Sequence, residues 1–77
     1  MITNLKQANK IIRDNPDLLE NREIAGNYNI LNSVKVSMND YCASLDALTA
    51  KLGKMVKVVE DAGKPVGYIF EGVYVSF

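Results

Sequence analysis

Side chains that could carry out covalent or acid–base chemistry are scarce in this 77-residue chain. It contains no histidine and one cysteine, Cys42. A thiolate is a nucleophile, but Cys42 follows Tyr41 on the apolar side of a predicted helix, so we expect it to pack in the core. A lone cysteine cannot form an internal disulfide, and one thiol combined with carboxylates would make an abnormal zinc site.

The acidic residues and the glycines do not complete a catalytic pattern. Four carboxylates fall on polar faces of predicted helices, where solvent and neighbouring arginines offset their charge. These are Asp14, Asp17, Glu20 and Glu23. The glycines of residues 63–72 lie in β-like sequence and lack the strand-to-helix context of a phosphate-binding loop. We therefore predict that the chain is not an enzyme and holds no metal or cofactor.

Charge and composition narrow the remaining classes of function and cellular location. Nine basic residues balance nine acidic ones, so the chain lacks the positive excess that drives non-specific binding to nucleic acid. No apolar run approaches the roughly 20 residues of a membrane-spanning helix. Residues 1–10 lack the basic-then-apolar pattern of a secretory signal. We expect a cytoplasmic protein, because a reducing compartment suits an unpaired cysteine.

The elements that must position any functional side chain begin with two predicted helices. Apolar residues at helical spacing, with Asn4 and Gln7 as a cap pair, predict a first helix. It ends near Asn15, because Pro16 disfavours helical geometry in the residue before it. Asn15 and Pro16 then fit the start of a second helix, which Gly26 can terminate in the left-handed conformation.

A short strand and a long helix are predicted next. Alternating apolar and polar residues favour a strand over residues 33–37. Ser37 and Asp40 have the spacing of a capping box, and the helix that they begin runs to Leu52 and ends at Gly53. Large residues recur along one face of this helix at steps of four and three. They are Tyr41, Leu45, Leu48 and Leu52.

The C-terminal part of the chain is rich in β-branched and aromatic residues and predicts a hairpin. Gly72 marks either a bulge in the second strand or, with Glu71, a tight turn to a third. The predicted order is α-α-β-α-β-β. We expect a single α+β domain over residues 1–77, with the long helix packed on a small antiparallel sheet that ends in a C-terminal β-hairpin.

The terminal strand is apolar on both of its faces, whereas a sheet with one solvated face alternates apolar and polar residues. Tyr68, Phe70 and Tyr74 share one parity along it. Aromatic rings on an uncovered sheet face are typical anchors of a protein interface. A strand buried on both sides in a well-wrapped core is the competing interpretation, and the sequence leaves the two open.

A line of small residues, Ala43, Ala47 and Ala50, is the second candidate for partner contact. It runs along the long helix, nearly half a turn from the large stripe. Small side chains let another backbone approach closely, from the N-terminal helices or from a second copy of the chain. Alanine is also simply a good helix former, which is an alternative reason for its presence.

Binding to DNA by a winged helix-turn-helix is the alternative function. Lysines near the end of the long helix and in the hairpin could supply a modest basic site. They are Lys51, Lys54, Lys57 and Lys64. Against this, residues 26–37 exceed the three or four residues of a helix-turn-helix turn. The outward face of the supposed recognition helix would also carry Asp40, Ser44 and Asp46, which a phosphate-lined groove would repel. Arginine is absent after Arg22.

We therefore predict a non-enzymatic protein-binding module, with homodimerisation as one form of binding. Its size, its lack of catalytic groups and its bias towards Asn and Lys are similar to those of small accessory proteins of phages and mobile elements. Many such proteins bind and inhibit a host factor, including defence machinery. The resemblance is one of type, covers no motif and assigns no residue.

Overall fold

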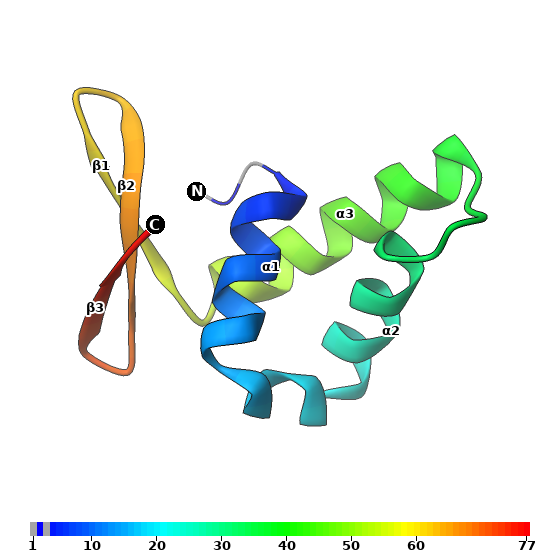
Figure 1. The fold of residues 1–77 in the computed structure, drawn as a ribbon, viewed down its shortest axis with the longest axis horizontal. Helices are drawn as coiled ribbons and strands as arrows, with labels where there is room; N and C mark the ends of the chain where they lie inside the picture. The colour runs from blue at the N-terminus through cyan, green and yellow to red at the C-terminus, as the bar shows by residue number, and fades with distance from the viewer. Residues whose placement is uncertain (1, 3) are drawn as a thin grey trace.

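Helices occupy the N-terminal two thirds of the chain and an antiparallel sheet occupies the rest (Figure 1). The computed structural model describes residue 2 and residues 4–77. The elements are α1 (Leu5–Asp14), the 3-10 helix η1 (Pro16–Glu20), α2 (Arg22–Leu31), α3 (Met38–Gly53), β1 (Lys57–Asp61), β2 (Lys64–Phe70) and β3 (Val73–Ser76). The α+β class predicted from the sequence is confirmed.

The first helix forms where the sequence predicted it. The Asn4 side chain accepts a hydrogen bond from the Gln7 backbone N–H at 2.9 Å, which satisfies one of the open donors of the first turn. The helix ends at Asp14, two residues before Pro16, as the restriction on the residue before proline requires. Its apolar residues Ile11 and Ile12 are buried.

The second helix differs from the prediction of a single helix over residues 15–26. Pro16 starts only a 3-10 turn, and α2 begins afresh at Asn21, whose side chain accepts from the backbone N–H of Glu23. Gly26 lies inside α2 and does not terminate it. A glycine in a helix costs about 1 kcal/mol. Burial of Ile24 and Leu31 offsets that cost, because each buried side chain contributes about 1.5–3 kcal/mol.

The strand predicted at residues 33–37 is wrong. This segment is a loop, and Val34 at its centre is 100% exposed. Alternation stabilises a strand only where a neighbouring strand completes the hydrogen bonds. Every strand of the sheet comes from residues 57–76, so among the described residues this segment has no strand beside it. The loop ends where Ser37 caps α3, accepting from Asp40 N–H at 3.1 Å.

The long helix α3 carries the predicted large stripe into the core. Leu48 and Leu52 are fully buried, and the helix packs mainly against α2. Cys42 is exposed, so its predicted place in the core is wrong. Successive helical residues are rotated by about 100°. Cys42 therefore points well away from Tyr41, and Ser44 is the neighbour that is buried instead.

The sheet has the strand order β1-β2-β3, and both pairs are antiparallel. Two-residue turns join the strands, and all four turn residues have a positive φ. These are Ala62 (52°), Gly63 (78°), Glu71 (53°) and Gly72 (80°). Positive φ at both central residues is the signature of the type I′ turn, whose twist matches that of the strands. Of the two alternatives for Gly72, the tight turn to a third strand is therefore the one that forms.

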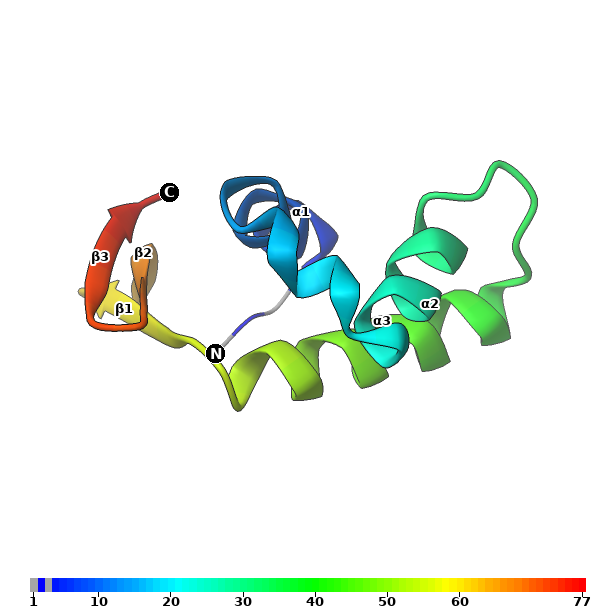
Figure 2. The ribbon, with the colours of Figure 1, turned by 90° about the horizontal axis from the view of Figure 1, so that it is seen from below.

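The helices all lie on one side of the sheet (Figures 1 and 2). Both views place α1 beside the sheet, whereas α3 runs away from it and only its C-terminal end approaches β1. The long helix was predicted to pack across the sheet; α1 holds that position instead. The reason is that α3 uses its apolar stripe against α2, while the end of α1 presents Asp14 and Asn15 to Tyr68 of β2.

The β1–β2 turn allows a direct test of the fold. Ala62 has a φ of 52°, a conformation that costs an L-residue with a Cβ about 1–2 kcal/mol. Asparagine tolerates it and favours the type I′ turn before glycine. Ala62→Asn should therefore raise the free energy of unfolding by about 0.5–1 kcal/mol. Urea unfolding checks this, with Ala62→Val as the matched variant that should lower it.

Candidate protein-binding interface

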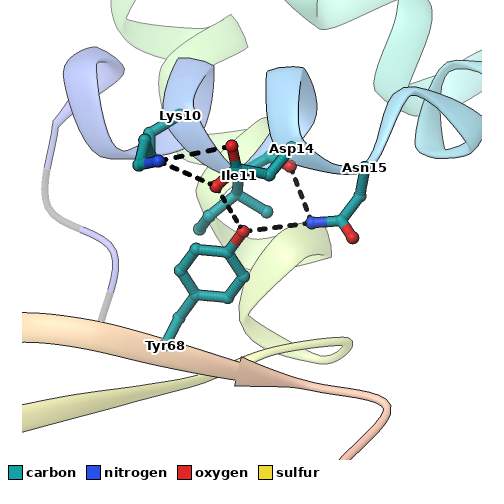
Figure 3. A network of polar contacts seen from close by, with 5 residues as sticks. All are labelled: Lys10, Ile11, Asp14, Asn15 and Tyr68. Carbon is teal, nitrogen blue, oxygen red and sulfur yellow. Dashed lines mark hydrogen bonds and ion pairs between the residues drawn. The ribbon is translucent and has the colours of Figure 1, made fainter. Parts of the chain in front are cut away.

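A polar network ties the sheet to α1 and fixes which way β2 faces (Figure 3). The Tyr68 hydroxyl donates to Asp14 Oδ2 at 2.7 Å and accepts from Asn15 Nδ2 at 3.2 Å. Asn15 Nδ2 also donates to the Ile11 carbonyl oxygen at 2.9 Å, and Lys10 Nζ lies 3.1 Å from Asp14 Oδ2. The network joins residues more than 50 positions apart in the chain.

The prediction that Tyr68 contacts a partner is wrong, because its side chain is fully buried. Its hydroxyl needs a partner once water is excluded, and the end of α1 supplies two. The ring packs in the core and lies 5.7 Å from the Phe77 ring, centroid to centroid. Phe70, a second predicted contact residue, is half-buried against the same core.

Burial and the hydrogen-bond network shift the pKa values of Tyr68 and Asp14. Burial, together with the hydrogen bond to Asp14, raises the pKa of Tyr68 to about 12. Both effects disfavour the phenolate, the first through loss of solvent and the second through the adjacent carboxylate. The hydrogen bond from Tyr68 lowers the pKa of Asp14 below its ordinary value of 3.8, and Lys10 adds to this effect. The folded state therefore prefers a neutral phenol beside an ionised carboxylate.

Strand register divides the apolar residues between two faces of the sheet. Tyr68 pairs with Val58 and Val75, and successive residues of a strand point to opposite faces. The neighbours in the next register position are Ile69 and Tyr74. Since Tyr68 points towards α1, Ile69 and Tyr74 point to the other face, where neither view shows a helix. We call this second side the outer face of the sheet.

The outer face is open and carries apolar residues, with Lys57 opposite Ile69 and Ser76 opposite Gly67 on the same face. Val59 and Ile69 are half-buried and Tyr74 is 52% exposed. The Tyr74 ring lies over Gly67 on this face. A Cβ added at Gly67 would come within 2.7 Å of the Tyr74 hydroxyl oxygen and 2.5 Å of the Val75 carbonyl oxygen. The glycine therefore makes room for the ring, which lies flat on the sheet.

The alanine line does not join this surface. Ala43 and Ala50 are exposed and Ala47 is half-buried, so no described part of the chain covers this line completely. It lies on α3, on the helical side of the molecule, whereas the outer face looks away from the helices. The two regions predicted from the sequence are thus separate surfaces.

The four lysines of the DNA-binding alternative are spread out. Lys51 Nζ pairs with Glu23 Oε2 at 3.5 Å, which reduces its local positive charge. Lys64 pairs in register with Asp61 at the hairpin tip, and Lys57 begins β1 at the other end of that strand. A strand of this length places Lys57 and Lys64 about 13 Å apart. Lys54 is exposed just after α3.

A second apolar region lies on the loop before α3, and the sequence analysis missed it. Val34 and Met38 are 100% and 76% exposed. A shallow pocket of about 220 Å³ is lined by Val36, Met38 and Tyr41. The sequence does contain recurring apolar residues through 30–38, but their alternation predicts a half-buried strand and not an exposed loop.

A pocket of about 340 Å³ lies between the end of α1 and the β2–β3 turn. Asp14, Asp17 and Glu71 are among its lining residues. Within residue 2 and residues 4–77, no group of three or more His, Cys, Asp or Glu side chains is placed to hold a metal ion. In the same residues, no helix has the length and hydropathy needed to cross a membrane.

Comparison with protein-family models, curated proteins and solved structures found no match to this chain. The function must therefore be inferred from the residues and their arrangement.

Removal of the Tyr68 hydroxyl should weaken the folded state. Tyr68→Phe keeps the ring but removes the hydroxyl's hydrogen bonds to Asp14 and Asn15, which retain only Lys10 and the Ile11 carbonyl oxygen. The free energy of unfolding should therefore fall by about 1–3 kcal/mol at neutral pH. Urea unfolding measures the change. Tyr74→Phe is the matched control, because its hydroxyl makes only a 3.5 Å contact on the surface. Equal losses in both variants would contradict the network's role.

The same pair of variants tests the pH dependence of stability. A pKa raised from 10.0 to about 12 means that the Tyr68 contribution is complete below pH 10 and is lost as the pH rises towards 12. The contribution of Asp14 to the free energy of unfolding depends on pH in the opposite direction. It is present above the ordinary pKa of this carboxyl and is lost as the pH falls through the lowered pKa of the folded state. Tyr68→Phe should abolish the alkaline loss due to this residue, whereas Tyr74→Phe should retain it.

Proposed function

We propose that this chain is a non-enzymatic protein-binding module that docks a partner protein on the outer face of its sheet. One observation carries the proposal: the outer face of the sheet exposes apolar side chains, and no helix of the described residues covers it. A partner that covers Ile69 and Tyr74 removes apolar surface from water, at about 25 cal/mol per Å². Tyrosine is also enriched among residues that dominate binding energy.

The kind of partner follows from charge and composition. The outer face offers Val59, Ile69 and Tyr74 and a single cation, Lys57, so it suits an apolar protein surface better than a phosphate backbone. We propose that the partner is a host factor and that the chain is a phage or mobile-element accessory protein acting in the host cytoplasm as an inhibitor. The small size of the chain and its bias towards Asn and Lys support this more specific proposal.

Binding to DNA remains the second candidate, because one observation favours it. Helix α2, a connection of residues 32–37, α3 and a hairpin follow one another in the order of a winged helix-turn-helix. The connection is shorter than the sequence suggested, because α2 continues to Leu31. The exposed Asp40 and Asp46 on α3 oppose this function, since a recognition helix in the major groove approaches phosphates.

Site-specific photo-crosslinking tests the proposed face. A benzophenone side chain placed at Tyr74 should yield a discrete adduct with a second protein in cells that express the chain. The same group at the exposed Val34 serves as the control and should not yield that adduct. Ile69→Lys, which puts a charge on the outer face, should reduce the adduct from position 74 at least tenfold, with an unchanged circular dichroism spectrum. Identical adducts from positions 34 and 74 would contradict the proposal.

A separate assay decides between the two classes. Duplex DNA of mixed sequence, titrated at low salt, should not bind the chain. Binding that falls steeply as salt rises would instead establish the DNA-binding alternative, because counterion release gives that dependence. Lys64→Ala should then weaken the binding, whereas Ile69→Lys should not.

A further inference from the structure

The hydrogen-bonding pattern of β3 leaves one edge of the sheet open. In β2–β3, Phe70 pairs with Val73 across the two-residue turn. The Phe77 N–H donates to the Val66 carbonyl oxygen at 3.0 Å. Backbone groups of an antiparallel strand alternate between its two neighbours. The odd positions of β3 therefore face β2, and the N–H and C=O groups of Tyr74 and Ser76 face outward.

The two edges of this sheet differ. At the other edge, β1 carries Lys57, Glu60 and Asp61, and its pairing register shifts between Val59 and Glu60. Charges and bulges are the devices by which proteins prevent a further strand from pairing. The β3 edge has neither: the side chains of residues 73–77 are uncharged, and the register of β3 with β2 is regular. The sheet is thus protected on one side and open on the other.

We infer that the β3 strands of two copies of this chain pair antiparallel about a two-fold axis at Val75, forming one six-stranded sheet. This inference deepens the proposed function, because it joins two outer faces into one larger surface. In this register Tyr74 of each copy lies opposite Ser76 of the other, so each outward N–H and C=O of those residues gains a partner.

The side chains of β3 fit this self-pairing. The large Tyr74 ring lies opposite a small serine, so the outer face accommodates two rings without a clash between them. Val75 lies opposite its own copy at a non-hydrogen-bonded position, and β-branched pairs stabilise such positions. No charged side chain lies on either strand, so like charges do not oppose the contact. The β3 edge is therefore compatible with a second copy in its backbone hydrogen bonding, in the size of its facing side chains and in its charge.

Disulfide trapping tests the register. In a Cys42→Ser background, Val75→Cys should form a disulfide-linked dimer under mild oxidation. The Cα atoms of facing residues at such a position lie about 4.5 Å apart, within disulfide range. Val73→Cys is the matched control: the two copies of residue 73 would be about 14 Å apart and should not cross-link. Equal cross-linking at both positions, or none at position 75, would overturn the inference.

Sedimentation equilibrium tests the same edge without cysteine chemistry. The wild-type chain should have twice its 8.5 kDa mass at hundreds of micromolar. Ser76→Pro removes an outward N–H and leaves the bonds to β2 intact, so it should give a folded monomer, whereas Ser76→Thr should remain a dimer. A wild-type monomer, or a dimer that survives Ser76→Pro with an unchanged dissociation constant, would refute the pairing. An adduct from position 74 with a foreign protein would still support the proposed function in that case.

Discussion

The hydrogen bond from a fully buried tyrosine to the end of α1 is the constraint on which the arrangement of the molecule depends. A phenol without water needs a polar partner, and Asp14 and Asn15 provide it at the point where Pro16 forces α1 to end. A network at the end of a helix is available because the last residues of a helix have left the regular backbone pattern. One side chain of the sheet thereby fixes the position of the whole sheet against the helices.

The orientation of Tyr68 then determines the rest of β2 through the two-residue period of a strand. Once Tyr68 points inward, Ile69 must point outward, and the paired position on β3 brings Tyr74 to the same outer face. A chain of 77 residues buries a smaller fraction of its surface than a larger domain does. The helices pack on one another and α1 lies against one side of the sheet, so the other side remains open.

The open surfaces share a chemical character that suits contact with protein. The outer face and the loop around Val34 expose apolar side chains with a single lysine beside each, and the side chains of the β3 edge are uncharged. Such surfaces gain free energy by excluding water and by completing backbone hydrogen bonds, neither of which requires a reactive group. The chain has no histidine, and its one thiol, Cys42, is exposed on α3.

The sequence by itself determined the elements whose signals are local. The cap at Asn4, the stop before Pro16 and the stripe of α3 depend on residues within a few positions of each other. At Gly72 the sequence left a bulge and a tight turn open, and the pairing of Phe70 with Val73 decided in favour of the turn. Tertiary structure decided the conformation of the segments that depend on contacts with residues distant in the sequence. The alternation at 33–37 met no neighbouring strand and became a loop, and Gly26 stayed helical because burial outweighed its propensity. Tyr68 and Tyr74 share one parity in the sequence, yet one is core and the other surface. The two-residue turn between them pairs Phe70 with Val73, so residues of opposite parity face each other across the two strands. Tyr68 therefore shares its face with Val75, and Tyr74 lies on the other face with Ile69.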